Sequence, residues 1–369
     1  MRLTALINFL VFISARSATS DCSCGYTINT TTQALFTEIL ETDFLHYNQT
    51  WNPITGLPEY GGSTSKNWVL QAYNVTPGGA NPYGKEAEYR NVVANPIESE
   101  YDWGGEGKGL ELWVRRESDG MVPMSEILSQ RDDVLYGSFR VGMKMTDVMG
   151  TVGAFFFYLN DSTEIDIEIL SKEDLNKTIN LVIQSPQSAK QGYASGPDFI
   201  KQSVDLFPAS GYNEYRFDWL PDRVDFYANS QLLTTVTQNV PRTAGKLHMS
   251  HWSNGNRGWS AGPPEQDAVM VVSYVKAYFN TSSERGSLAC VGAAKKVCAV
   301  PDQTVPPEIS GPNGNVTGKT FFFGSGNETS AVINDSEDGP KTSDGIRQSQ
   351  DFVMSCILSL LCIILIQSM

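Results

Sequence analysis

The stretch Glu164-Ile165-Asp166-Ile167-Glu168 alternates acidic and apolar side chains within an otherwise largely apolar segment. Alternate side chains of a β-strand lie on the same face, so the three acids should face one way and the two isoleucines the other. Strands are normally depleted in Asp and Glu, and like charges packed on one strand face oppose folding. The stretch therefore predicts a strand with one core face and one row of functional carboxylates.

Carboxyl groups at short range suit glycoside hydrolysis with retention, in which an ionised acid attacks the anomeric carbon and a protonated acid gives its proton to the leaving oxygen. Those two groups lie about 5–5.5 Å apart. The Cα atoms of Glu164 and Glu168 should be roughly 13 Å apart on a strand, and two Glu side chains are long enough to approach each other across Asp166. Mutual repulsion should separate the pKa values of the three acids and leave one of them protonated near the working pH. The alternative interpretation is a solvated strand face with incidental acids.

The stretch resembles the E-x-D-x-E signature of glycoside hydrolase family 16, the β-jelly-roll glucanases and transglycosylases. Further segments resemble other motifs of that family in the correct order, namely YGSFRVGMK at 136–144, GTVGAFF at 150–156, NEYRFDW at 213–219 and VDFY at 224–227. The resemblance covers roughly residues 21–280. Two positions depart from it: Asn213 stands where the family usually has His, and Asn229-Ser230 replaces a common Asp-Gly hairpin.

The resemblance implies an all-β fold, a β-jelly-roll sandwich of two antiparallel sheets as in concanavalin A-like lectins and glucanases. It implies that Glu164 is the nucleophile, Asp166 its assisting partner and Glu168 the general acid and then base. The signature has no extra residue, as in plant xyloglucan transglycosylases, bacterial lichenases and fungal wall transglycosylases. Water or a sugar hydroxyl can release a glycosyl-enzyme ester, so the sequence leaves hydrolysis and transfer both open.

A second group of candidate residues lies in the Gly- and Asn-rich loop at 251–264. Aromatic rings beside polar donors suit sugars, so we predict that Trp252, Asn254 and Trp259 bind substrate. The family resemblance places a cleft tryptophan at Trp252, and packing against the domain edge is the alternative for Trp259. Trp103, in another Gly-rich segment, is a further candidate for lining the cleft.

The middle of the chain consists of short apolar segments separated by Gly, Pro, Asn and Asp, with no long helical periodicity, which favours a sandwich. The predicted strands are 67–73, 109–115, 135–145, 152–159, 164–170, 178–184, 215–220, 223–228, 246–251 and 268–279. Residues 21–300 should form the glycosidase-like domain. Residues 301–345 are rich in Pro, Gly, Ser, Thr, Asn and Asp, and we expect a disordered, glycosylated stalk there.

Both ends of the chain resemble targeting segments. Residues 1–20 combine Arg2, an apolar stretch and small residues before a cleavage site, which is typical of a secretory signal peptide. Residues 346–369 end in an apolar tail that follows small residues, which is the layout of a GPI-attachment signal that is removed. Ser343 is the predicted attachment site, Gly339 is a second candidate, and a single membrane-spanning tail is the alternative.

The sequons agree with passage through the secretory pathway, and nine of them begin at Asn29, Asn48, Asn74, Asn160, Asn176, Asn280, Asn315, Asn327 and Asn334. The cysteines outside the removed tail are Cys22, Cys24, Cys290 and Cys298. An even number in an oxidising compartment implies disulfides, and we expect two bridges between the two ends of the domain without assigning partners.

The formal net charge of −14, without a visible basic patch, argues against nucleic acid as a partner. The sequence thus predicts a monomeric cell-surface glycosidase or transglycosylase that acts on β-glucan or a related cell-wall polysaccharide and is attached to the membrane through a GPI anchor. In this layout it resembles fungal wall-remodelling proteins. No cofactor or catalytic metal is expected, and a structural Ca²⁺ is left open. A carbohydrate-binding surface protein without turnover is the alternative, and a purely structural wall glycoprotein comes third.

Overall fold

The computed structural model describes residues 22, 24–28, 34–45, 51, 55–56, 67–96, 107–117, 119–282 and 297–300. The predictions for Trp103, Cys290, Ser343, the signal peptide, the stalk and the C-terminal tail fall outside these residues. Within the described ranges, none of the helices has the length and apolarity needed to cross a membrane.

Strands dominate the described chain. They are β1 (Gly25–Thr27), β2 (Glu38–Asp43), β3 (Trp68–Leu70), β4 (Tyr73–Val75), β5 (Gly84–Ala87), β6 (Val92–Asn95), β7 (Gly109–Val114), β8 (Met121–Ser129), β9 (Val134–Lys144), β10 (Val152–Asn160), β11 (Thr163–Leu170), β12 (Thr178–Gln184), β13 (Phe199–Ser203), β14 (Asn213–Leu220), β15 (Arg223–Ala228), β16 (Gln231–Val236), β17 (Lys246–Trp252), β18 (Ala268–Thr281) and β19 (Val297–Ala299). The helical elements are short: α1 (Pro186–Gln191) and the 3₁₀ turns η1 (Tyr89–Asn91), η2 (Ser171–Asn176) and η3 (Gly196–Asp198).

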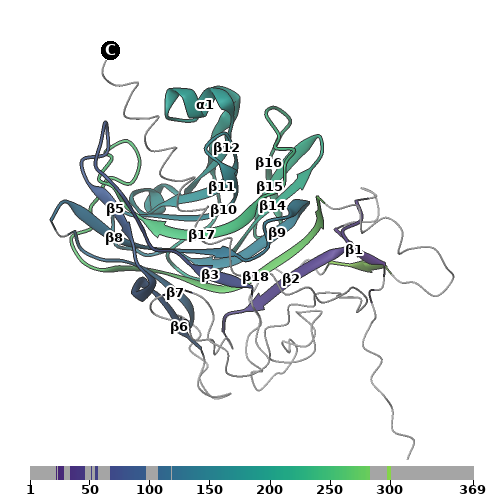
Figure 1. Cartoon of the computed structure of the whole chain (residues 1–369), viewed down its shortest axis with the longest axis horizontal. Coiled ribbons are helices and arrows are strands. Elements are labelled where there is room, and N and C mark those ends of the chain that lie inside the picture. Colours follow the sequence, from purple (N-terminus) through teal and green to yellow (C-terminus); the bar gives the residue numbers. More distant parts are fainter. Residues whose placement is uncertain are drawn as a thin grey trace, which may run out of the picture. The chain divides into compact units, whose positions relative to one another are not determined.

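Two large sheets form the domain (Figure 1). The first has the order β13-β12-β11-β10-β17-β8-β5-β4, with β3 also paired to β8, and the second has the order β16-β15-β14-β9-β18-β7-β6, with β2 also paired to β18. Pairing is antiparallel in both sheets except between β5 and β8. The predicted fold class, a β-jelly-roll sandwich, is confirmed.

The core lies between the two sheets. Phe155 and Phe157 of β10 contact the second sheet directly, because their ring centroids lie 5.5 Å from Phe217 and 4.3 Å from Trp219, respectively. All four rings are fully buried. Burying one such side chain contributes about 2–3 kcal/mol. This packing fixes which face of β10, and of its neighbour β11, points away from the core.

The hairpin between β10 and β11 sets the register of the acidic strand. The side-chain oxygen of Asn160 accepts hydrogen bonds from the backbone N–H of Ser162 at 3.0 Å and from its hydroxyl at 2.8 Å, which closes the turn locally. The strands then pair with Phe156 opposite Asp166. A slip of one residue would turn the acids into the core, so the buried face of β11 and the turn must agree.

The strand predictions differ from the structure in several places. The segment 67–73 was expected to be one strand, but β3 ends at Leu70 and β4 begins at Tyr73, since β3 pairs with β8 whereas β4 pairs with β5. The prediction also missed β1, β2, β5, β6, β13, β16 and β19, most of which are short. Strand β8 was not predicted either. It is covered on both faces and contains Pro123 and Glu126, so it shows neither alternation nor a continuous apolar run.

A disulfide joins Cys22 to Cys298, across 276 residues of sequence. Beside it β1 pairs with β19 in parallel, so the first and last described strands lie together. This is one of the two bridges that were expected between the ends of the domain. Cys24 is buried, and Cys290 falls outside the described ranges.

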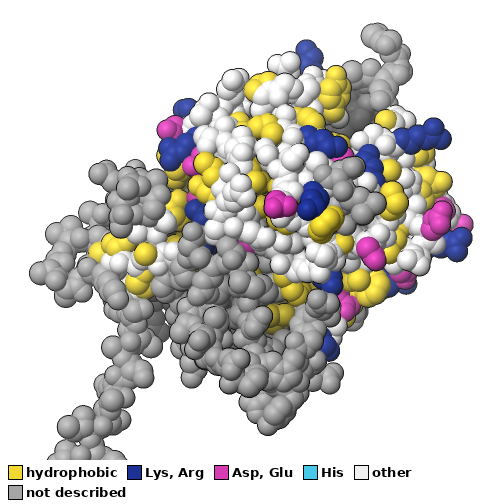
Figure 2. Space-filling view, turned by 180° about the vertical axis from the view of Figure 1, so that it is seen from behind, with side chains coloured by type: hydrophobic (Ala, Val, Ile, Leu, Met, Phe, Trp, Pro, Cys, Tyr) yellow, Lys and Arg dark blue, Asp and Glu magenta, His cyan; other side chains and the backbone are white. Residues whose placement is uncertain are grey.

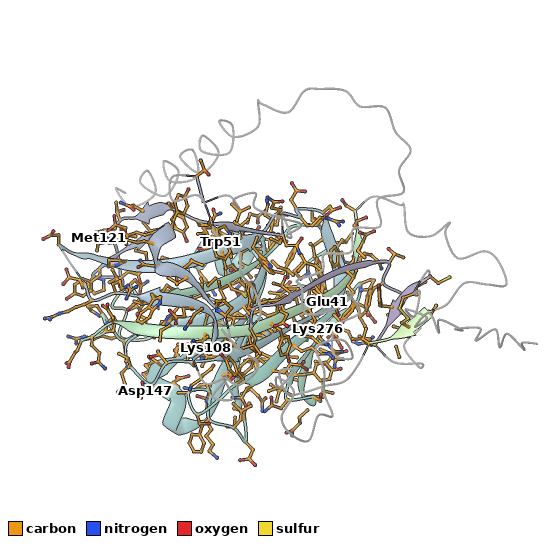
Figure 3. The ribbon with its side chains drawn as sticks, turned by 90° about the horizontal axis from the view of Figure 1, so that it is seen from below. Glu41, Trp51, Lys108, Met121, Asp147 and Lys276 are labelled. Atoms are coloured by element: carbon orange, nitrogen blue, oxygen red, sulfur yellow. A yellow bond between two sulfur atoms is a disulfide. The ribbon has the colours of Figure 1, made fainter. Side chains whose placement is uncertain are left out.

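The second sheet carries buried charges on the face opposite to the core. Lys276 of β18 pairs in register with Glu41 of β2, and both are 1% exposed (Figure 3). Burial lowers the pKa of Lys276 to about 8. Nearby, the hydroxyl of Tyr274 donates to Glu214 at 2.8 Å, and Arg216 pairs with Asp218. On the molecular face seen in Figure 2, basic side chains are interspersed with acidic ones.

Candidate active site

The three acids lie on one face of β11, as the alternation predicts. Ile165, Ile167 and Ile169 point into the core and are fully buried. Glu164 and Glu168 keep some exposed surface, whereas Asp166 between them is 5% exposed. The strand thus places two reachable carboxyl groups on either side of a buried one.

Neighbouring strands surround the acids in register. On β10 the opposite residues are Tyr158, Phe156 and Ala154, and on β12 they are Gln184, Val182 and Asn180. Ala154 beside Glu168 is the smallest of these side chains. An aromatic side chain therefore stands next to Glu164 and next to Asp166, whereas Glu168 has a methyl group beside it.

The acids are electrostatically unlike ordinary surface carboxylates. Burial, opposed by a hydrogen bond with Asp166 and aided by the charge of Asp161, raises the pKa of Glu164 to about 7. Burial and the charge of Glu164 raise the pKa of Glu168 to about 8. The pKa of Asp166 is raised well above its usual value by burial and by Glu164. The hydrogen bond with Asp166 favours the ionised form of Glu164, and the charge of Glu164 in turn favours the protonated forms of Glu168 and Asp166.

Asp166 acts on Glu164 through its proton. A protonated Asp166 donates to the ionised Glu164 and so favours the charged form of that neighbour. The second oxygen of Asp166, Oδ2, is buried and has no hydrogen-bond partner within the part of the chain that the structure describes. The pair shares one proton, and the unpartnered oxygen keeps Asp166 from ionising easily.

Trp259 contacts the last acid of the row. Its indole N–H donates to Oε2 of Glu168 at 3.0 Å, and its ring lies edge-on against Phe199 of β13 with centroids 5.7 Å apart. Two hydrogen bonds hold the loop in this position. The backbone N–H of Trp259 donates to the carbonyl of Asn256 within the loop, and the side chain of Lys172 donates to the carbonyl of Arg257. Trp259 was predicted to bind substrate or to pack at the edge; here it also orients a carboxyl group.

The other predicted binding residues have different surroundings. The ammonium group of Lys85 lies 4.7 Å from the centre of the Trp252 ring. Asn254 is 9% exposed, and its side-chain oxygen accepts from Ser260 at 3.1 Å and from the backbone of Asn256 at 3.2 Å. Asn254 thus holds the loop together, and its contact with substrate stays a prediction, as does that of Trp252.

Sequence reasoning missed Lys85 and Glu126. The positive charge of Lys85 lowers the pKa of both Glu164 and Glu168, although burial outweighs this effect. Glu126 raises the pKa of Glu164 through its own charge. The signal in the sequence was a lone Glu between Ser125 and Ile127 in the segment that forms β8, which pattern alone does not separate from a loop.

No cluster of three or more His, Cys, Asp or Glu side chains is arranged to hold a metal ion among the described residues. The chemistry that these residues can perform is proton transfer and nucleophilic attack by carboxyl groups.

Comparison with known proteins agrees with this chemistry. The chain matches the family described as glycosyl hydrolases family 16 over residues 90–273. It is 32% identical over 155 residues to a β-glucanase of Brevibacillus brevis, covering 40% of this chain and 56% of the relative. It is 34% identical over 125 residues to a β-glucanase of Bacillus subtilis strain 168, covering 32% and 47%. The chain thus spans about half the length of these relatives.

Among solved structures, a β-glucanase of Bacillus licheniformis has a TM-score of 0.49 at 22% identity, covering 65% of this chain and 97% of that one. The apo Crh5 transglycosylase has a TM-score of 0.46 at 17% identity, covering 66% and 84%. The match over residues 90–273 includes the strands that carry the acids and the loop that carries Trp259. Through the domain that contains these residues, the chain belongs to glycosyl hydrolases family 16.

Proposed function

We propose that the protein is a retaining glycosidase or transglycosylase that acts on β-linked glucan through a covalent intermediate on Glu164. The observation that carries this proposal is the geometry of β11, which places Glu164 and Glu168 on one strand face with the buried Asp166 between them, while Trp259 donates to Glu168. The pKa of each of the three carboxyl groups is raised, so a carboxylate and a carboxylic acid can coexist on this face near neutral pH.

In the first step the ionised Glu164 attacks the anomeric carbon while Glu168 gives its proton to the departing glycosidic oxygen. A glycosyl ester forms on Glu164, and the carbon–oxygen bond to the leaving group breaks. Before the attack, the hydrogen bond from Asp166 stabilises the ionised form of Glu164. Trp259 holds the oxygen of Glu168 that carries charge after the proton has left.

In the second step the ionised Glu168 takes a proton from the incoming hydroxyl, whose oxygen attacks the anomeric carbon and displaces Glu164. Water as the acceptor gives hydrolysis, and a sugar hydroxyl gives transfer. The names of the relatives support β-glucan as the substrate class, since they are called β-glucanases. One of the similar structures is called a transglycosylase, so both outcomes are tested below.

The same proposal places the enzyme at the cell surface, secreted, N-glycosylated and held by a GPI anchor. The support comes from the two terminal segments and the sequons in the sequence. The Cys22–Cys298 disulfide is consistent with an oxidising compartment. Release of the protein from membranes by a phosphatidylinositol-specific phospholipase would support the anchor, whereas retention after that treatment would contradict it.

The experiment compares three variants of the secreted protein on an activated aryl β-glycoside. Glu164→Gln should abolish turnover, because no covalent intermediate can form. Glu168→Gln should retain the first step, because the activated leaving group needs little protonation, and added azide should give the β-glycosyl azide. Asp205→Asn, at an exposed carboxylate far along the sequence from the acids, should leave the rate unchanged.

A panel of β-glucans and chitin oligomers with labelled acceptors then separates hydrolysis from transfer and from binding alone. Wild-type rates in either Gln variant would refute the assignment of the acids. Binding of glucan by a wild-type protein that releases no product would favour a carbohydrate-binding protein instead.

A further inference from the structure

The two histidines of β17 lie on opposite faces of the first sheet. His251 is fully buried on the core side, where Nδ1 lies 2.8 Å from the carbonyl oxygen of Leu112 and Nε2 lies 2.9 Å from the hydroxyl of Thr151. Burial lowers the pKa of His251 to about 4, so it stays neutral. Both ring nitrogens have partners, and the role of His251 is structural.

His248 lies on the same face as the acids. It is opposite Phe156 of β10, which is in turn opposite Asp166 of β11. Strands are about 4.8 Å apart, so the backbone of His248 lies roughly 10 Å from that of Asp166. The imidazole lies against Phe156 with ring centroids 4.8 Å apart and beside Tyr158 at 5.5 Å. These two rings restrict the orientation of the imidazole next to the catalytic row.

Glu126 on β8 fixes one nitrogen of this imidazole. Nδ1 of His248 lies 2.8 Å from Oε1 of Glu126, and the hydroxyl of Tyr73 donates to Oε2. Burial by itself would raise the pKa of Glu126, but the bond to His248, the charge of His248, the bond from Tyr73 and the charge of Lys85 bring it below its usual value. An ionised Glu126 only accepts hydrogen bonds, so Nδ1 of His248 carries a proton and donates to it.

The second nitrogen, Nε2, is left available. It has no hydrogen-bond partner among the described residues, and it is not one of the side-chain atoms that are buried without a partner. It is therefore accessible to a small polar group, although the residue as a whole is only 6% exposed. With Nδ1 held by Glu126, Nε2 is the ring nitrogen left to bond a hydroxyl group, which can both donate and accept.

We propose that His248 binds substrate, with Nε2 hydrogen-bonded to a hydroxyl of the glycan unit next to the one held by the acids. Glu126 is a positioning residue that fixes the orientation of the imidazole through Nδ1, and Tyr73 holds Glu126. The inference rests on the proposed function and narrows its substrate class to glycans with an unsubstituted hydroxyl at that position of the neighbouring unit.

The decisive variant is His248→Phe, which keeps an aromatic ring against Phe156 and removes both nitrogens. With a β-glucan oligosaccharide, kcat/KM should fall about 10- to 100-fold, mainly through a higher KM, because the sugar hydroxyl loses its hydrogen-bond partner. With an activated aryl β-monoglycoside, which has no neighbouring sugar unit, kcat/KM should change less than about twofold.

Glu126→Gln tests the positioning role separately. The Gln side chain can still form a hydrogen bond with the imidazole, but it no longer requires a proton on Nδ1. The fall in kcat/KM on the oligosaccharide should therefore be smaller than for His248→Phe, and kcat/KM on the monoglycoside should again be unchanged. Oligosaccharides that lack one hydroxyl at a time on the neighbouring unit complete the design. For one of these oligosaccharides, removing the hydroxyl should lower kcat/KM of the wild-type protein but not that of His248→Phe, because both changes remove the same hydrogen bond.

The outcomes separate this inference from the proposed function. A wild-type protein that turns over neither substrate would refute the proposed function. If the wild-type protein is active, two results would refute only the role of His248. One is an equal fall in kcat/KM on both substrates in His248→Phe, and the other is an unchanged kcat/KM on the oligosaccharide. If His248→Phe does not fold, which its unfolding curve would reveal, the same comparison with Glu126→Gln decides the matter.

Discussion

Replacing Glu168 by Gln should stabilise the folded protein at neutral and alkaline pH while it removes the proposed acid and base. The pKa of Glu168 rises from 4.5 to about 8, first because of burial and then because of the charge of Glu164. A carboxyl group whose pKa is higher in the folded state binds its proton more tightly there. The contribution of this proton to the free energy of unfolding is fully present below the pKa of the unfolded state. It is lost as the pH rises through the pKa of the folded state.

The size of this effect follows from the interval of 4.5 to about 8. At about 1.4 kcal/mol per pKa unit, the folded state loses at most about 5 kcal/mol between those two values. The repulsion from Glu164 is shared between two groups, and Glu168 keeps some exposed surface, so we expect about 2–3 kcal/mol. Gln has nearly the same shape and can still accept the hydrogen bond from Trp259.

Urea unfolding of both proteins at pH 5 and pH 9 measures this difference. The free energy of unfolding should be similar for the two at pH 5, and the variant should be the more stable at pH 9. Glu173→Gln is the matched control, because the bonds from Lys201, Asn180 and Thr178, together with the charge of Lys201, outweigh burial and lower the pKa of that carboxyl. Glu173→Gln should destabilise the protein above the pKa of the acid. A Glu168→Gln variant that is no more stable than wild type at pH 9 would refute the reasoning.

Three further outcomes follow from the same geometry. The pH profile of kcat/KM should be a narrow bell, rising as Glu164 ionises near pH 7 and falling as Glu168 loses its proton near pH 8; a flat profile from pH 6 to 9 would contradict the two assignments. Trp259→Phe should move the alkaline limb of that profile to higher pH, because it removes a hydrogen bond that favours the ionised Glu168, and an unmoved limb would show that the bond is absent in solution. Cys298→Ser opens a bridge across 276 residues and should lower the free energy of unfolding by about 4 kcal/mol in non-reducing denaturation, whereas an equal stability would show that the bridge does not form.

The acidic strand is the part of this protein that its sequence determined by itself. Side chains alternate along any strand, so the isoleucines of the segment 164–168 could be placed in the core and the acids on the other face without knowing which strands lie beside them. The same rule located β10, β12 and β14, whose apolar residues also follow a strand pattern. The motifs and their order then indicated the family.

Contacts between strands could be known only from the tertiary structure. Trp259 reaches Glu168 across 91 residues, and His248 reaches Glu126 across 122. Such pairs depend on the order β11-β10-β17-β8, and sheet order is set by packing of whole faces rather than by any local pattern. The pKa order of the acids has the same origin, because burial, the largest cause of each shift, exists only once the sheets have formed.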